Sequence, residues 1–145
     1  QAVRKVGHPN CGSGYWEDFS LDFGDIEFCY RLRRAGYRIV VHKSSIIEHP
    51  LGRPRQLSLF GRRIFTSNHA AFRRYLNFRN MVYFFLYVYA DRSAFFMPCY
   101  LVSRLAITTA KILLMEEDRL PKVRAILRGT WDGLRGNMRR RYIEG

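Results

Sequence analysis

Two acidic side chains near the start of a helical pattern are the strongest candidates for chemistry in this sequence. Asp22 and Asp25 precede Phe28, Cys29 and Leu32, which share one face at helical spacing. A carboxylate in a first helical turn is stabilised as an anion by free backbone N–H groups and the helix dipole. If it faces a cleft, it can accept a proton from a substrate hydroxyl. The same positions suit a capping or dipole role, with Asp22 as the N-cap, and spacing alone leaves both roles open.

Two further side chains near this helix are candidates. Glu27 lies four residues before Arg31, an orientation that favours a helical ion pair, and the spacing predicts a solvated one. His49 precedes Pro50, and an imidazole at the exit of a strand can bind a divalent metal or a phosphate. A lone histidine near a loop can equally be only hydrogen-bonded. Since no HxH, HExxH or Asp-x-Asp spacing accompanies it, a metal there would need carboxylates from elsewhere.

Three arginines among aromatic residues form the third candidate group. Arg73, Arg74 and Arg79 alternate with Phe72, Tyr75 and Phe78, an arrangement that could hold phosphate or stack bases. The alternative is the ordinary charged face of a helix. Three widely spaced cysteines, with no CxxC pair, argue against a disulfide framework or a cysteine-rich zinc site.

Regular elements must position these residues, and the sequence predicts them as follows. A loop covers residues 1–21, and a helix runs from Asp22–Asp25 to Gly36, which occupies the position of a left-handed cap. Strands follow at Tyr37–His42 and Ile46–His49, then a basic loop over residues 50–67. Helices are expected from about Asn68, over Ala94–Met115 and over Arg119–Leu134.

The net charge of +13 is unevenly distributed. Residues 51–115 hold ten basic residues and one acid, which suggests an anionic partner, either nucleic acid or an acidic membrane surface. The longest uncharged runs, 80–90 and 93–103, have 11 residues each, whereas a span needs roughly 20. The polar residues Arg104, Thr108 and Lys111 share one face of an apolar helix, which favours lying in the membrane interface. Packing of these helices on protein alone remains the alternative.

Taken together, these residues resemble the C-terminal half of a family 2 glycosyltransferase, an inverting enzyme of the GT-A fold. The phrase SLDFGDIEFCYRLRRAGYRI, followed by His49-Pro50-Leu51-Gly52, is similar to that of the rhamnosyltransferase and galactofuranosyltransferase branch. The R-x-Y-x-x-x-R-N pattern from Arg73 to Asn80 and the ending RAILRGTWDGLRGNM extend the resemblance over most of residues 15–138. Ser20 and Gly24 depart from the usual phrase, which leaves the acceptor identity open.

The resemblance implies roles for the candidate residues. Asp25 matches the general base that takes the proton from the acceptor hydroxyl. Asp22 and Glu27 match neighbouring acids that hold the acceptor. His49 matches a histidine that, in some members, completes a divalent metal site (Mg²⁺ or Mn²⁺) at the nucleotide diphosphate, and the other ligands are expected outside this chain. The arginines Arg73, Arg74 and Arg79 are expected to contact phosphate or membrane.

The implied fold is α/β: the C-terminal part of a GT-A domain over residues 1–67, with a helix and short strands, then a helical, basic region over residues 68–145. The implied function is transfer of a sugar such as rhamnose from a nucleotide-diphospho-sugar to a lipid-linked or polysaccharide acceptor. The enzyme would be cytoplasmic, peripheral to the inner membrane, and part of polysaccharide or cell-wall biosynthesis. A homo-oligomer is compatible with this interpretation, and no nucleic-acid partner is expected.

In this family the nucleotide-binding βαβ half precedes the matched region, so we expect this chain to be a fragment that is inactive alone. The alternative that the residues leave open is a non-catalytic helical domain that anchors to a membrane surface or to a partner.

Overall fold

The computed structural model describes residues 14–19, 21–42, 44, 55–59, 61–89, 96–139 and 142, which belong to two units. The first unit spans Gln1–His49 and the second spans Pro50–Gly145. The predicted boundary lay at 67/68, whereas the structure groups the segment ahead of the helices with the helices themselves. Each unit has its own set of contacts.

The first unit is built around helix α2, Gly24–Arg34, and a short 3₁₀ turn, η1, at Glu17–Phe19. The segment before the helix packs back on it. Arg31 donates from Nη2 to the Gly14 carbonyl at 2.8 Å, and the rings of Tyr15 and Phe28 lie 4.7 Å apart. These contacts fix the segment that leads into the helix relative to the helix itself.

Helix α2 begins at Gly24, within the predicted range, and ends where predicted. Its N-cap is Phe23, with φ +70° and no side-chain cap, so Asp22 is not the N-cap. The next residue, Gly24, lies close to the preceding turn, and a Cβ there would make a tight contact of 3.1 Å with the Phe19 carbonyl oxygen. At the other end Gly36 has φ +84°, and the Tyr37 N–H donates to the Leu32 carbonyl oxygen, five positions back, in a Schellman cap. The predicted left-handed cap at Gly36 is confirmed.

The predicted strand at Tyr37–His42 is wrong for this structure. The segment has no regular secondary structure, and none of the described residues pairs with it. A strand exists only through hydrogen bonds to a neighbour, and propensity cannot supply one. Ile39, Val40 and Val41 are therefore exposed, at 45, 81 and 85%. The other predicted strand, Ile46–His49, lies outside the described residues.

The predicted basic loop over residues 50–67 contains a β-hairpin instead. Strand β1, Arg55–Leu59, pairs antiparallel with β2, Arg62–Thr66, in register Arg55 with Thr66. Gly61 has φ +71°, a conformation that glycine adopts without strain. Gly61 between two short segments with apolar residues was the available signal for this hairpin, and only the first segment, Gln56–Leu59, alternates polar and apolar residues.

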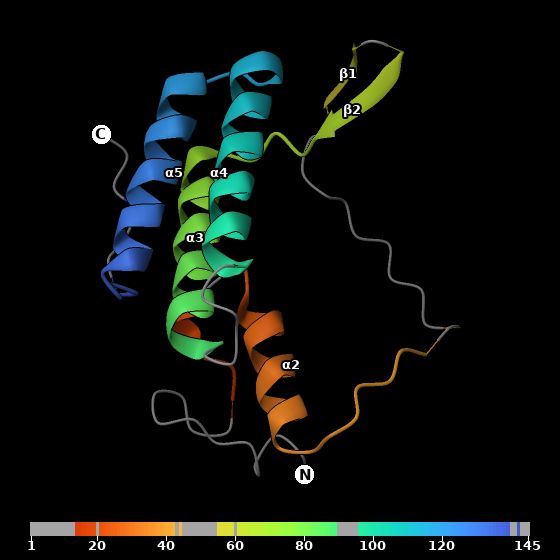
Figure 1. Cartoon of the computed structure of the whole chain (residues 1–145), viewed down its shortest axis with the longest axis vertical. Helices are drawn as coiled ribbons and strands as arrows, with labels where there is room; N and C mark the ends of the chain where they lie inside the picture. The colour runs from red at the N-terminus through yellow and green to blue at the C-terminus, as the bar shows by residue number, and fades with distance from the viewer. Residues whose placement is uncertain are drawn as a thin grey trace. The chain divides into compact units, whose positions relative to one another are not determined.

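Three helices form the rest of the second unit (Figure 1). Helix α3, Ala71–Tyr83, continues into a π-helical turn, η2, at Phe84–Val88, and is followed by α4, Phe96–Met115, and α5, Arg119–Leu134. The predicted bounds of α5 and the end of α4 are confirmed. Helix α3 starts three residues after the predicted Asn68, which has φ +45° and cannot continue a right-handed helix.

Helices α3 and α5 run parallel and touch through glycines. A Cβ at Gly129 would overlap the Tyr75 carbonyl group, and one at Gly133 would lie 2.7 Å from the Arg79 carbonyl oxygen. The absence of these two side chains lets the backbones approach closely and buries Tyr75, Phe78 and Val82 of α3.

We predict that Gly129→Ala destabilises the second unit by about 1–3 kcal/mol, because the new methyl group must push α5 away from the α3 backbone. Urea denaturation followed by circular dichroism measures the change. Leu120→Ala, at a 67% exposed position of the same helix, is the control and should stay within about 0.5 kcal/mol of the parent. Equal stability of the two variants would contradict the close contact.

Candidate functional site

The predicted catalytic acid Asp25 lies exposed in the first turn of α2. Asp22 is half-buried three residues earlier, on the turn that leads into the helix. Both carboxylates therefore lie at the N-terminal end of one helix, where its dipole favours anions. Asp25 is open to solvent, so its carboxylate is accessible to another molecule.

The backbone beside these two acids is unusual. Leu21 has φ +68° and Phe23 has φ +70°, so two non-glycine residues in left-handed conformations flank Asp22. Such residues each cost roughly 1–3 kcal/mol and occur preferentially at functional sites, where the surrounding structure holds them. The strained turn sets the direction from which the chain enters the helix, and so it sets the position of Asp25.

Glu27 forms the ion pair that its spacing predicts, but the pair is buried rather than solvated. Its two carboxylate oxygens accept hydrogen bonds from Arg31 at 2.6 and 3.0 Å, and the Glu27 side chain is fully buried. Arg31 also binds the Gly14 carbonyl. The acceptor-binding role expected for Glu27 stays a prediction. The contacts of the Glu27–Arg31 pair link α2 to the segment that precedes it.

The three arginines predicted as one phosphate or membrane contact lie in different environments. Arg79 is 3% exposed and donates to the Met138 carbonyl oxygen at 2.7 Å and to Asn80 at 3.0 Å. Arg74 forms an ion pair with Glu116 at 2.5 Å. Arg73 is half-buried and lines a shallow hollow with Asn68. The structure does not bring the three side chains to one surface, and Arg74 and Arg79 have structural partners.

A buried polar cluster joins four elements of the second unit. The Glu116 carboxylate lies between the end of α4 and the start of α5 and is fully buried. It accepts a hydrogen bond from the Thr66 hydroxyl at the end of β2, and it pairs with Arg74 of α3 at 2.5 Å and Lys122 of α5 at 3.1 Å. Lys122 also donates to Asn68 Oδ1 at 2.6 Å.

The charges around Glu116 outweigh its burial. Burial raises the pKa of this carboxyl, whereas the Thr66 hydrogen bond and the positive charges of Arg74 and Lys122 lower it. The lowering is the larger effect, so the pKa lies below its usual value of 4.5. Next in the chain, the exposed Glu117 pairs with Arg55 of β1, which lowers its pKa as well.

A second buried contact links α3 to α5 directly. Tyr75 donates its hydroxyl proton to Asp132 at 2.8 Å, and both side chains are at most 1% exposed. Burial, and then the hydrogen bond and charge of Asp132, raise the pKa of Tyr75 above its usual 10.0, although Arg79 opposes the shift. The pair lies one helical turn from the Gly129 contact, so it fixes the register of the two helices.

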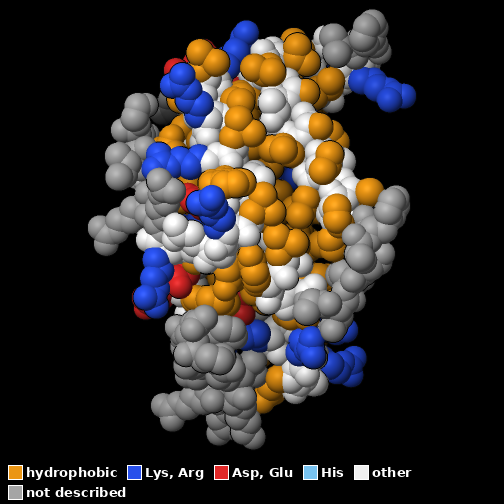
Figure 2. Space-filling model, turned by 60° about the vertical axis from the view of Figure 1, so that its left-hand side comes forward, with side chains coloured by type: hydrophobic (Ala, Val, Ile, Leu, Met, Phe, Trp, Pro, Cys, Tyr) orange, Lys and Arg blue, Asp and Glu red, His pale blue; other side chains and the backbone are white. Residues whose placement is uncertain are grey.

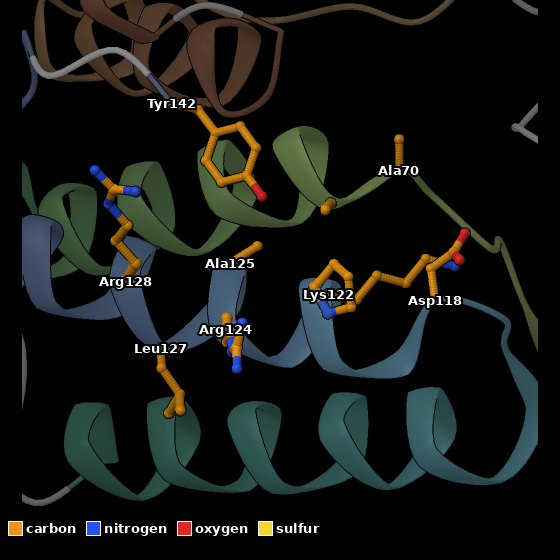
Figure 3. Close-up of a pocket in the computed structure, with 10 residues that line it drawn as sticks. Ala70, Asp118, Lys122, Arg124, Ala125, Leu127, Arg128 and Tyr142 are labelled. Atoms are coloured by element: carbon orange, nitrogen blue, oxygen red, sulfur yellow. The ribbon is translucent and has the colours of Figure 1, made fainter. Parts of the chain in front are cut away.

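A basic hollow of about 750 Å³ opens beside the starts of α3 and α5 (Figure 3). The small side chains of Ala70 and Ala125 leave this volume open. Arg124, Arg128 and Lys122 supply its positive charge, with Asp118 at one end. The hydroxyl group of Tyr142 points toward it from the opposite side. Since Lys122 is already held by Glu116, the two arginines are the cations of this hollow that lie nearest to solvent.

The metal site implied at His49 lies outside the described residues, and its other ligands are expected outside this chain. In the described part of the chain, no group of three His, Cys, Asp or Glu side chains could hold a metal ion, so the implied site stays a prediction.

Comparisons with family models, with curated proteins and with solved structures give no match to this chain. The resemblance to family 2 glycosyltransferases therefore rests on the residues of the sequence themselves.

Sequence reasoning missed the Glu116 cluster and the Tyr75–Asp132 pair. One signal for the first was available: the acidic run Glu116, Glu117 and Asp118 lies directly ahead of a helix, where anions are favoured. Two of its partners, Arg74 and Thr66, lie 42 and 50 residues away, and no local pattern points to them.

We predict that Glu116→Gln destabilises the second unit by about 3–5 kcal/mol at pH 7, because it leaves two buried cations without their counter-charge. Since the folded-state pKa of Glu116 is lowered, its stabilisation is complete above pH 4.5 and is lost as the pH falls through the folded-state pKa. The variant should lack this acid dependence in urea titrations across pH 3–7. Glu117→Gln, at the exposed neighbour, should change little, and a similar loss in both variants would contradict the cluster's role.

Tyr75→Phe should reduce stability by about 1–3 kcal/mol, because Asp132 loses a buried hydrogen bond. The raised pKa of Tyr75 means that its stabilisation is complete below pH 10.0 and is lost as the pH rises through the folded-state pKa. Alkaline denaturation profiles should therefore be flatter for the variant than for Tyr15→Phe, an exposed control. Identical profiles would rule out the assigned contact.

Proposed function

We propose that this chain is the acceptor-side, catalytic-base part of an inverting family 2 glycosyltransferase. The observation that carries the proposal is Asp25: an exposed carboxylate in the first turn of α2, directly after a strained turn, within the phrase DIEFCYRLRRAGYRI. Neither an ordinary cap nor a solvated helix face requires two left-handed residues at this point. The substrate class is a nucleotide-diphospho-sugar donor with a lipid-linked or polysaccharide acceptor.

In this proposal the Asp25 carboxylate takes the proton of an acceptor hydroxyl while that oxygen attacks the anomeric carbon of the donor sugar. The bond from this carbon to the diphosphate oxygen breaks, and the nucleoside diphosphate leaves with the electron pair. One displacement inverts the configuration. Asp25 ends protonated and returns its proton to water. Asp22 positions the acceptor, and the Glu27–Arg31 pair holds the helix that carries Asp25.

The exposed segment Ile39–Val41 supports the same proposal. These β-branched residues have no strand partner among the described residues, although their composition suits a strand. A sheet contributed by a nucleotide-binding βαβ half, which the resemblance implies, would pair with and cover them. Activity would then require that half in addition to these 145 residues, together with the divalent metal and His49 that the resemblance implies.

A non-catalytic domain that binds a membrane surface is the second candidate. It is favoured by the exposed apolar side chains of α4, such as Val102, Ile107 and Leu114. The two candidates differ in what they require of Asp25. Only the glycosyltransferase gives this carboxylate a role.

The test is Asp25→Asn in the enzyme encoded together with the upstream reading frame. We expect sugar transfer to fall by about 10²–10⁴-fold with donor binding unchanged, since the amide cannot accept the proton. Glu17→Gln, an exposed acid of the same unit, should transfer at the parental rate. Nuclear magnetic resonance of the product should show an inverted anomeric centre.

Full transfer by Asp25→Asn would overturn the proposal. So would an upstream reading frame that encodes no nucleotide-binding half, because these residues then have no donor to act on.

A further inference from the structure

Helix α4 turns an uncharged face outward. Only Met97, Thr108 and Ile112 of its 20 residues are buried. One exposed side of α4 carries no charge, and the exposed Arg104 lies outside it. We term this side the α4 outer face: Phe96, Cys99, Val102, Ser103, Ala106, Ile107, Ala110, Leu113 and Leu114. An exposed apolar surface of this length marks a site for another molecule rather than for water.

Helix α5, which packs against α4, continues this surface and borders it with arginine. Leu120, Leu127, Trp131 and Leu134 form an exposed apolar stripe at helical spacing. Three arginines lie beside this stripe on the circumference of the helix, and we term them the arginine row: Arg124, Arg128 and Arg135. Figure 2 shows a hydrophobic band on one face of the molecule with Lys and Arg side chains along its left border.

No acid is exposed on either helix. Helix α4 has no acidic residue, and the only one in α5, Asp132, is buried against Tyr75. The surface therefore offers apolar side chains and positive charge together. Trp131 lies where the two meet, with the Arg135 guanidinium 4.3 Å from its ring centroid. Tryptophan beside arginine at an apolar edge is typical of the boundary between hydrocarbon and headgroups.

We propose that the α4 outer face and the apolar stripe of α5 bind the surface of an anionic membrane, with the arginine row contacting lipid phosphates. The apolar side chains enter the boundary between headgroups and acyl chains, as an interfacial amphipathic helix does. The charge of the arginine row matches that of an anionic leaflet. This inference concerns the second unit and does not rest on Asp25.

The geometry favours α4 lying in the membrane plane over crossing the bilayer. By length and composition α4 could cross, since an 18-residue window has a mean hydropathy of 1.3 and is 17% buried. However, Lys111 donates to the Phe65 carbonyl at 3.2 Å and Arg104 is exposed on the same helix. A crossing α4 would also draw the arginines of α5, its packed neighbour, into hydrocarbon, where each charge is costly.

Charge also argues against a second copy of this chain as the occupant. In a twofold dimer the same patch meets itself, so the two arginine rows would lie near each other with no exposed acid on α4 or α5 to balance them. Lipid phosphates supply the missing negative charge.

The experiment measures binding of the 145-residue chain to vesicles of phosphatidylcholine, alone or mixed with phosphatidylglycerol. The chain has two tryptophans, Trp16 at 5% and Trp131 at 52% exposure. On binding to the anionic vesicles, Trp131 emission should shift to shorter wavelength and be quenched by brominated lipids, while Trp16 stays constant. Trp131→Phe should remove the signal but not sedimentation with the vesicles.

Two sets of variants test the two parts of the surface. Arg124→Gln with Arg128→Gln and Arg135→Gln should weaken partitioning by about 100-fold, at roughly fivefold per charge. The control with the same change in net charge is Arg33→Gln with Arg34→Gln and Arg38→Gln, exposed residues of the first unit, and it should bind nearly as the parent does.

For the apolar part, Leu113→Ser with Leu114→Ser should weaken binding by roughly tenfold or more, since two side chains no longer enter the interface. Val40→Ser with Val41→Ser, two exposed apolar residues of the first unit, is the control.

Four results would overturn the proposal: no binding to anionic vesicles, binding without a change at Trp131, equal loss in the arginine-row variant and its control, or equal loss in the two serine variants. Resistance to carbonate extraction would show a crossing helix, and a lipid-free dimer that protects Trp131 would show a second copy. Either would replace the membrane-plane surface. None of these results bears on whether Asp25→Asn abolishes sugar transfer, so the two proposals fail independently.

Discussion

The buried carboxylate of Glu116 is the point at which the elements of the second unit meet. It follows α4, precedes α5, accepts a hydrogen bond from the end of β2 and pairs with cations of α3 and α5. A buried carboxylate is tolerated only when charges and hydrogen bonds replace its lost hydration. Here two cations and a hydroxyl do so, each from a different segment. The carboxylate can be buried only if those segments arrive together, which ties the hairpin to the helices.

The close parallel contact of α3 and α5 depends on polar pairs and on two glycines. Glu116 and Lys122 fix the starts of the two helices, the Tyr75–Asp132 pair fixes their register, and Gly129 and Gly133 allow the backbones to approach. Helices α3 and α5 bury their facing sides, which include Tyr75 and Val82, on each other, whereas α4 buries only Met97, Thr108 and Ile112. The consequence is an unusually apolar exterior on α4, and the membrane-binding proposal follows from it.

The first unit uses polar burial differently. The Glu27–Arg31 pair is internal to one helix and reaches only the Gly14 carbonyl, so it joins the helix to the segment before it. The strained turn at Leu21 and Phe23 then places Asp25 at an exposed position, while the aromatic contacts of Tyr15 and Trp16 hold the turn. Rigid support beneath an exposed carboxylate is what a catalytic base needs, and it is the feature on which the proposed transfer reaction depends.

Local patterns in the sequence determined the helices, their ends and the candidate acid. The 3.6-residue period predicts α3, α4 and α5, Gly36 marks the end of α2, and the spacing of Glu27 and Arg31 predicts their pair, because each depends on residues a few positions apart. Only the tertiary structure decided that this pair is buried, that Tyr37–His42 lacks a strand partner, and that Arg74 and Arg79 serve the fold. Burial and pairing are set by residues distant in the chain, such as those around Glu116, and no periodicity reports which distant segments will meet.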